Sequence, residues 1–173
     1  MEKMNKPTKK YLTLVAIGIC CIFSHTKQWF AKPAKEVELG NSSYIEQAAK
    51  DKSRDPMIFL LNKERSRENL QELKYNNLLY QSAKAKSCHM LENGYFAHVS
   101  PEGIDGWYFF NQTKYHYEYA GENLAVDFQS DELTMNAFMS SKTHKENILG
   151  EDFTEIGIGR CGGYITLHFG KPK

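Results

Sequence analysis

Two histidines and one glutamate are the side chains of this sequence that could do chemistry together. His98, Glu122 and His144 lie in separate short blocks rich in glycine, serine or asparagine. If the three meet in a cleft, two imidazoles and one carboxylate can hold a divalent metal ion such as zinc or calcium. Without a metal, a glutamate that accepts a hydrogen bond from histidine favours the imidazolium and fixes the tautomer of the ring, which would make the histidine a general base. The three residues come from distant segments, so no single-helix ligand motif supports the metal.

Each of these residues also has a purely structural interpretation. His98 could be a loop histidine bonded to backbone, and Glu122 a buried carboxylate that ties its loop to backbone amides or to His98. His144 and Asn147 are three residues apart on one predicted helical face and could pack and cap that turn. The sequence leaves the chemical and the structural interpretations open.

Three other polar residues near these blocks fit structural roles better. Ser100 is the hydroxyl nearest in sequence to His98, but it lacks the strand-to-helix elbow of a serine nucleophile and suits a turn. His116 lies among tyrosines and His168 lies in the predicted last strand. We interpret both histidines as surface or sheet residues rather than ligands.

Helical periodicity predicts two helices before the first histidine block and another directly after it. Asp55 followed by proline is a helix start, and the apolar pattern continues to about Asn69. A second helix is predicted over residues 77–93 and ends at a glycine. Glycines and a proline in residues 95–106 predict a loop that presents His98, before an aromatic-rich helix over residues 107–114.

The C-terminal part of the sequence predicts strands separated by short helices. Residues 115–127 are expected to be extended, and a helix is expected from Asp131 to Met139, followed by a helical turn that contains His144. Residues 154–169 alternate isoleucine with glycine and contain a Gly-Gly turn, which predicts a β-hairpin. This order of elements indicates an α+β domain with an antiparallel sheet covered by helices.

Length and charge limit the class of protein. A chain of 173 residues suits one domain plus a leader. Lys and Arg total 22 against 21 for Asp and Glu, so we expect no nucleic-acid partner. Cys20 and Cys21 lie in the leader, which leaves Cys88 and Cys161 as one disulfide or as two free thiols.

The N-terminal segment has the pattern of an export signal. Four lysines precede an uncharged stretch at residues 11–23. As a helix this stretch is about 20 Å long against roughly 30 Å for the hydrocarbon core, so a cleaved signal peptide competes with an uncleaved membrane anchor. We expect this leader at residues 1–25, a polar spacer at 26–54 and the domain at 55–173.

Four blocks of the domain together carry a family resemblance. They are residues 94–103, 121–123, 141–149 and 153–159. Their order and spacing resemble the CAP superfamily, the domain of cysteine-rich secretory proteins, antigen 5 and plant pathogenesis-related proteins, in its bacterial form. The resemblance covers roughly residues 56–170 and implies a three-layer α-β-α sandwich with a central antiparallel sheet, outside the cytoplasm.

The resemblance also implies a site. The family's cleft gathers two histidines and two glutamates, and His98 and Glu122 match the first histidine and the glutamate of its Gly-Glu-Asn motif. His144 matches the histidine that bacterial members place in a Ser-x-x-His-x-x-Asn-Ile-Leu block. The family's histidine on the last strand has no match near Tyr164, and its second glutamate has none around Ser141.

Two functions follow from this site as hypotheses. In the first, the domain binds an envelope, lipid or peptide ligand in the cleft, outside the cytoplasm, with the leader as membrane anchor or signal peptide. In the second, the same residues form a hydrolase centre, with or without a metal ion. The resemblance transfers no specific ligand.

Overall fold

The structure, a computed structural model, describes residue 50 and residues 52–173. Its elements are, in chain order, α2 (Pro56–Arg67), β1 (Lys74–Tyr75), α3 (Asn77–Glu92), α4 (Gly106–Gln112), β2 (Tyr117–Val126), α5 (Asp131–Ser140), α6 (Lys142–Ile148), β3 (Glu155–Cys161) and β4 (Tyr164–Pro172). The helices and strands predicted from periodicity are therefore confirmed, with ends shifted by a few residues. The predicted leader and most of the spacer lie outside the described residues. Within the described part, no helix is long and apolar enough to cross a bilayer.

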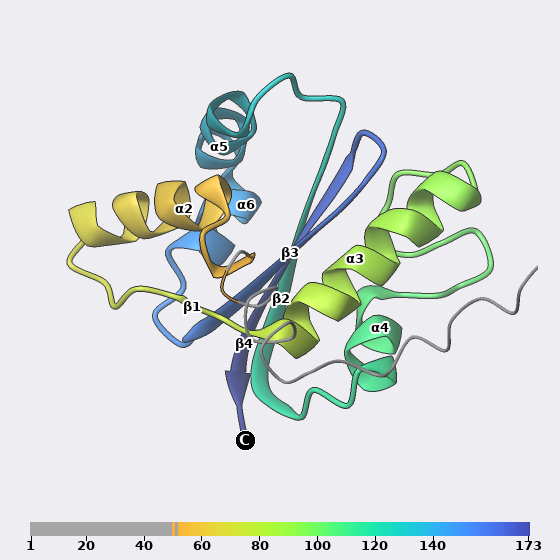
Figure 1. Cartoon of the computed structure of the whole chain (residues 1–173), viewed down its shortest axis with the longest axis horizontal. Helices are drawn as coiled ribbons and strands as arrows, with labels where there is room; N and C mark the ends of the chain where they lie inside the picture. Colours follow the sequence, from red (N-terminus) through yellow and green to blue (C-terminus); the bar gives the residue numbers. More distant parts are fainter. Residues whose placement is uncertain (1–49, 51) are drawn as a thin grey trace, which may run out of the picture. The chain divides into compact units, whose positions relative to one another are not determined.

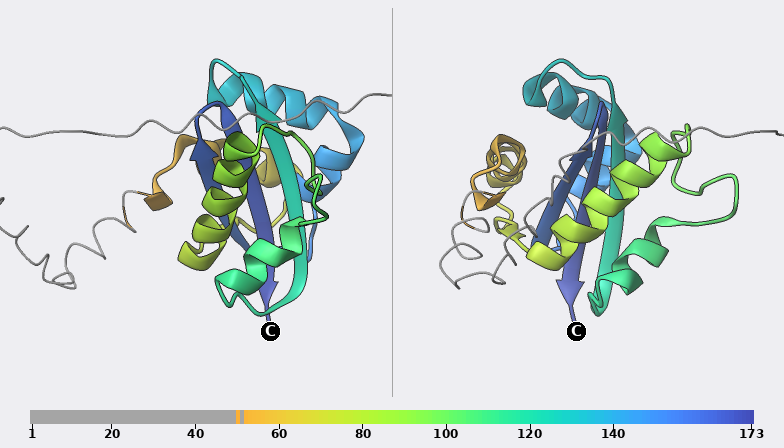
Figure 2. Two further views of the ribbon diagram at one scale, coloured as in Figure 1. Left: turned by 90° about the vertical axis from the view of Figure 1, so that its right-hand side faces the viewer. Right: turned by 45° about the vertical axis from the view of Figure 1, so that its right-hand side comes forward.

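The fold is the predicted α+β sandwich of three layers. The sheet has the strand order β1-β3-β4-β2, and the three long strands pair antiparallel. The two-residue strand β1 adds to β3 in parallel, a pairing that was not predicted. Helices α3 and α4 cover one face of the sheet, and α2, α5 and α6 cover the other (Figures 1 and 2).

The two faces of the sheet differ in the size and polarity of their side chains. Isoleucines, leucine and phenylalanine of β3 and β4 join residues of α2, α5 and α6 in the main hydrophobic core. The opposite face of the same strands carries Gly157, Gly159, Thr166 and His168, with Thr166 and His168 fully buried. Because successive side chains of a strand point to opposite faces, these small and polar residues all lie against α3.

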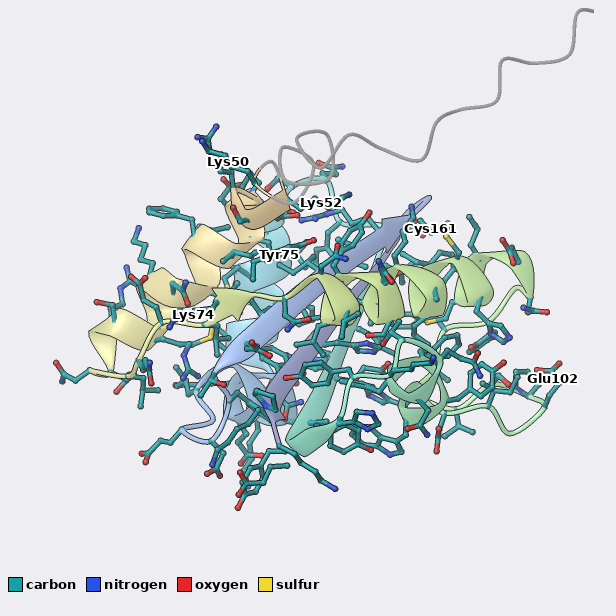
Figure 3. All side chains as sticks on the ribbon, turned by 60° about the horizontal axis from the view of Figure 1, so that its bottom comes forward. Lys50, Lys52, Lys74, Tyr75, Glu102 and Cys161 are labelled. Carbon is teal, nitrogen blue, oxygen red and sulfur yellow. A yellow bond between two sulfur atoms is a disulfide. The ribbon has the colours of Figure 1, made fainter. Side chains whose placement is uncertain are left out.

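A disulfide fixes α3 to the sheet. Cys88 in α3 and Cys161 at the end of β3 are bonded, with their Cα atoms 4.9 Å apart (Figure 3). The sequence had left this pair open between a disulfide and two thiols. The bond closes a covalent loop over a separation of 73 residues, from the middle of the domain to its C-terminal hairpin.

A buried arginine joins α2 to the segment that follows α6. The Arg65 side chain is fully buried, and its guanidinium donates to four backbone carbonyls. The acceptors, at 2.8 to 3.3 Å, are the carbonyl oxygens of Gln71, Ile148, Gly150 and Phe153. Arg65 thus holds the end of α6, the helix that carries His144 and Asn147.

We expect Arg65→Met to destabilise the domain by about 3 kcal/mol, because it leaves buried carbonyl oxygens without donors. Urea unfolding followed by circular dichroism measures this loss. The matched control is Arg67→Met, since Arg67 is exposed and pairs only with Glu64 at 2.6 Å, a contact worth less than about 1 kcal/mol. Equal losses in the two variants would contradict the role given to Arg65.

Candidate functional site

A chain of hydrogen bonds links α3, two strands and the His98 loop. Nδ1 of His98 lies 2.7 Å from Oε1 of Glu122, and Nε2 of His168 lies 2.9 Å from Oε2 of the same carboxylate. Nδ1 of His168 lies 2.7 Å from the Ser82 hydroxyl. Glu122 on β2 and His168 on β4 are direct partners in the sheet, which explains why their side chains meet. Of the predicted residues, His98 and Glu122 are therefore brought together.

The Glu122 carboxylate is ionised. Burial by itself would raise its pKa, but hydrogen bonds from His168 and His98 and the nearby positive charge of Lys86 lower the pKa to about 2. Complete burial lowers the pKa of His168. His168 donates from Nε2 to the ionised carboxylate, and its Nδ1 lies within hydrogen-bond distance of the Ser82 hydroxyl, which also donates to the Leu79 carbonyl oxygen at 2.9 Å.

A buried lysine of α3 binds the backbone of the His98 loop. The ammonium group of Lys86, on α3, lies 2.9 Å from the carbonyl oxygens of both Ala97 and His98, and 3.2 Å from the Tyr95 hydroxyl. The Lys86 side chain is fully buried, and burial lowers its pKa. Three acceptors satisfy its three donors, so Lys86 positions the loop rather than facing the cleft.

His144 lies beside the cleft and not in its hydrogen-bond chain. Its ring packs edge-to-face on Phe138, with centroids 5.1 Å apart, and lines an adjacent apolar pocket. Burial lowers the pKa of His144, and repulsion from the protonated form of His98 lowers it further. The carbonyl oxygen of His144 accepts from Asn123, so its backbone supports the cleft wall.

Asn147, one turn further along α6, is the residue of this helix that reaches the cleft. Its Nδ2 donates to the Glu122 carbonyl oxygen at 3.1 Å and to Oδ1 of Asn123 at 2.8 Å. Ser100 has the predicted turn role, because its buried hydroxyl accepts from the backbone amides of Glu102 and Ile104.

The cleft itself has a volume of about 430 Å³. Its wall includes His98, Asp105, Trp107, Gly121, Glu122 and Asn147. His98 and Trp107 are well exposed, whereas the Glu122 side chain is only 6% exposed at the floor. A cleft of this size accommodates a small molecule or one side chain of a larger ligand.

The predicted metal triad is not assembled in this structure. Both carboxylate oxygens of Glu122 accept from histidine rings, and His144 faces Phe138. Among residues 50 and 52–173, no group of three histidine, cysteine, aspartate or glutamate side chains is arranged so that it could hold a metal ion.

The Glu122–His168 pair predicts a loss of stability in acid. The folded pKa of Glu122, about 2, is below its ordinary value of 4.5, so its stabilising contribution is present above pH 4.5 and is lost as the pH falls towards 2. This contribution is on the order of 3 kcal/mol. The lowered pKa of His168 acts in the same direction below its ordinary value of 6.5.

Urea unfolding at several pH values between 7 and 3 measures this acid loss. We expect Glu122→Gln to be less stable at neutral pH but to lose less stability on acidification than the wild type. Glu146→Gln removes an exposed glutamate of α6 and should leave the acid loss unchanged. The same pH dependence of stability in all three proteins would show that Glu122 is not the source of the acid loss.

Sequence reasoning missed three members of the site. His168 was interpreted as a surface or sheet residue, but it is fully buried and contacts Glu122. The last strand thus supplies a histidine four residues beyond Tyr164, where none had been found. Ser82 and Lys86 were not singled out, although their spacing of four puts both on one face of α3. A serine and a lysine on the buried face of a helix were the available signal.

Comparisons with known proteins agree with this fold. The family model described as CAP, Cysteine-rich secretory protein family, matches residues 58–166. The uncharacterized protein YkwD of Bacillus subtilis (strain 168) is 36% identical over 115 residues, which cover 65% of this chain and 45% of YkwD. The uncharacterized membrane protein YlbC of the same organism is 27% identical over 117 residues, 68% of this chain and 34% of YlbC. The chain spans less than half the length of both curated relatives.

Two solved structures share the fold. An extracellular protein containing a SCP domain from Bacillus anthracis str. Ames superposes with a TM-score of 0.66 and 26% identity, over 76% of this chain and 44% of that chain. An outer surface protein from Borrelia burgdorferi superposes with a TM-score of 0.61 and 20% identity, over 78% of this chain and 97% of that chain.

Proposed function

Because the chain belongs to the Cysteine-rich secretory protein (CAP) family, we propose that it acts outside the cytoplasm as a binding module. Its ligand, an envelope component, a lipid or a peptide, enters the cleft between His98, Glu122 and Trp107. The observation that supports this most directly is an exposed imidazole held by a buried carboxylate at the edge of an open cleft.

The rigidity of the cleft floor favours binding. Glu122 receives one hydrogen bond from each of two histidines, and His168 is stacked on Phe110 with ring centroids 4.3 Å apart. A site whose polar groups are already held in place loses less conformational entropy when a ligand binds. His144 contributes to the adjacent wall rather than to the floor.

The extracytoplasmic location is a proposal that rests on relatives and on the disulfide. One structural neighbour is described as an extracellular protein and another as an outer surface protein. A disulfide between Cys88 and Cys161 persists in oxidising compartments. Residues 1–25 would then direct export, as a signal peptide or as an anchor.

Hydrolysis is a second candidate function, and one observation favours it. Since Glu122 accepts the Nδ1 proton of His98, a neutral His98 presents Nε2 to the cleft as a base for a water molecule. Ser82 cannot serve as the nucleophile in this conformation, because it is fully buried. A peptide-hydrolysis assay in which turnover is lost in both His98→Gln and Glu122→Gln would support this candidate.

Fluorine NMR of the full-length protein tests the binding function. The chain has two tryptophans, and labelling with 5-fluorotryptophan gives Trp107 a signal at the cleft, assigned with Trp107→Phe. We expect at least one class among short peptides, saccharides and lipid head groups to shift this signal in a saturable way. The shift should be weakened in His98→Leu and kept in His116→Leu, which changes an exposed histidine.

If no class shifts the Trp107 signal, or if His98→Leu binds like the wild type, the cleft is not the binding site. In the first case, the hydrolase assay becomes the remaining test of the cleft.

A further inference from the structure

Three side chains of the cleft wall, those of His98, Asn147 and Asp105, can offer acceptors to a ligand. His98 must carry its proton on Nδ1, because the ionised Glu122 can only accept. A neutral His98 ring, whose side chain is 60% exposed, therefore presents the Nε2 lone pair to the cleft. In this form of the ring, the exposed nitrogen of His98 is an acceptor.

Asn147 adds a second acceptor in a fixed orientation. Both of its amide hydrogens are used, one by the carbonyl oxygen of Glu122 and one by Oδ1 of Asn123. The reverse orientation would place its oxygen against two other acceptors. Asn123 is held in turn, because its own amide donates to the His144 carbonyl oxygen. Oδ1 of Asn147 therefore lies along Gly121 with no donor among the described residues.

Asp105 adds a third acceptor and a charge. Its Oδ1 caps α4 by accepting from the Tyr108 amide at 3.1 Å, and within residues 52–173 no donor is bonded to Oδ2. Within residues 52–173, the acidic side chains that line the cleft are Asp105 and Glu122, and Lys86 lies behind the His98 loop. With neutral histidines these leave one negative charge, and the hydrogen bonds of Lys86 are all used by the loop and Tyr95.

Trp107 supplies an aromatic face beside these acceptors. It is 41% exposed and packs on Phe110 and Tyr117, with ring centroids 5.6 and 6.1 Å away. Tryptophan is the aromatic side chain that binds cations best through its face.

We infer that the cleft recognises a primary ammonium group on an apolar stem, which donates to His98, Asp105 and Asn147 and packs against Trp107. An ammonium has three donors and no acceptor, and it neutralises the excess negative charge of the cleft. A carboxylate or phosphate would meet acceptors and like charge. This inference rests on the proposed binding function and specifies its ligand chemistry.

The first test compares three probes of one size on the fluorine-labelled full-length protein: butylammonium, butanol and butyrate. A probe with so few atoms binds weakly, so titration extends to about 100 mM. We expect a saturable shift of the Trp107 signal with butylammonium and none with butyrate, while the second tryptophan provides an internal control. Saturable binding of butyrate or butanol without butylammonium would refute the amine and leave the cleft as a binding site. No shift with any of the three probes would refute the ammonium specificity, whereas the binding function is refuted only when the panel of peptides, saccharides and lipid head groups also leaves the signal unchanged.

The second test removes the charge of the cleft. Asp105→Asn keeps the oxygen that caps α4, and we expect it to weaken butylammonium binding about tenfold. Asp152→Asn makes the same charge change at an exposed position outside the cleft and should change the affinity less than about twofold. Equal effects of the two variants would show that only the net charge of the protein matters and would overturn the contact between Asp105 and the ammonium group.

Two larger probes then identify the source of the ammonium. N-acetyl-lysine methylamide represents a peptide side chain, and glucosamine represents an amino sugar. Tighter binding of the lysine probe than of butylammonium supports the inference and names a peptide side chain as the carrier, whereas tighter binding of glucosamine, whose ammonium lies on a polar ring, would overturn the apolar stem. Binding of N-acetylglucosamine equal to that of glucosamine would contradict the inference, because acetylation removes the charge.

Discussion

Gly157→Ala should destabilise the domain by about 4 kcal/mol, although it adds only one methyl group. A Cβ atom at Gly157 would lie 2.1 Å from the backbone carbon of Leu79 and 2.1 Å from the backbone nitrogen of Tyr80. The obstacle is the backbone of α3 and not the end of a flexible side chain. Helix α3 would have to move away from β3, and the contacts across this layer would be lost.

The same substitution should damage the functional site. Gly157 is the direct sheet partner of His168. Helix α3, which packs closely on Gly157, carries Ser82 and Lys86. We expect displacement of α3 to break the bond between Ser82 and His168 and to release the His98 loop. Urea unfolding measures the stability, and the fluorine signal of Trp107 reports the cleft.

Gly103→Ala is the matched control for the loss of a glycine. Its backbone has φ +85°, and a Cβ there meets no atom within 4 Å. We expect a cost of about 1 to 2 kcal/mol from the backbone conformation alone. If Gly157→Ala costs no more than this control, the close packing of α3 on β3 is not a determinant of the fold.

Periodicity was sufficient for the elements and for one face of the sheet. The alternation of Ile156 and Ile158 with glycines identified β3 and the side chains that enter the main core. Periodicity could not show what covers the other face of the sheet. A strand pattern assigns alternate residues to one face, but it does not identify the element that packs on that face. His168 was therefore left as a sheet residue until α3 was seen to lie over it.

The site shows a similar limit. The resemblance named His98 and Glu122 together, and the structure brings their side chains into hydrogen-bond contact. Each of them lies in a short motif that is recognisable from the local sequence. The resemblance also grouped His144 with them, but helix α6 turns that ring towards Phe138 and presents Asn147 to the cleft. Which of two residues one turn apart faces a cleft depends on how the helix is docked, and Arg65 sets this through the carbonyl of Ile148.

The same reasoning applies to Cys88 and Cys161. Their separation of 73 residues carries no information on distance, so only the folded structure decides between a disulfide and two thiols. That decision has a large consequence, because the stabilisation by a disulfide grows with the length of the loop that it closes in the unfolded chain.

Removal of the disulfide should cost about 4 kcal/mol, the value expected for closing a loop of this length. Cys88→Ser combined with Cys161→Ser removes the cross-link, and urea unfolding compares this variant with the oxidised wild type. Cys20→Ser combined with Cys21→Ser changes two leader cysteines and should leave the unfolding midpoint unchanged. Adding a reductant should lower the stability of the wild type and of this control, but not that of the Cys88 and Cys161 variant. The wild type can also be unfolded and refolded with its thiols reduced. If its stability is then the same as that of the oxidised protein, packing alone holds α3 on β3.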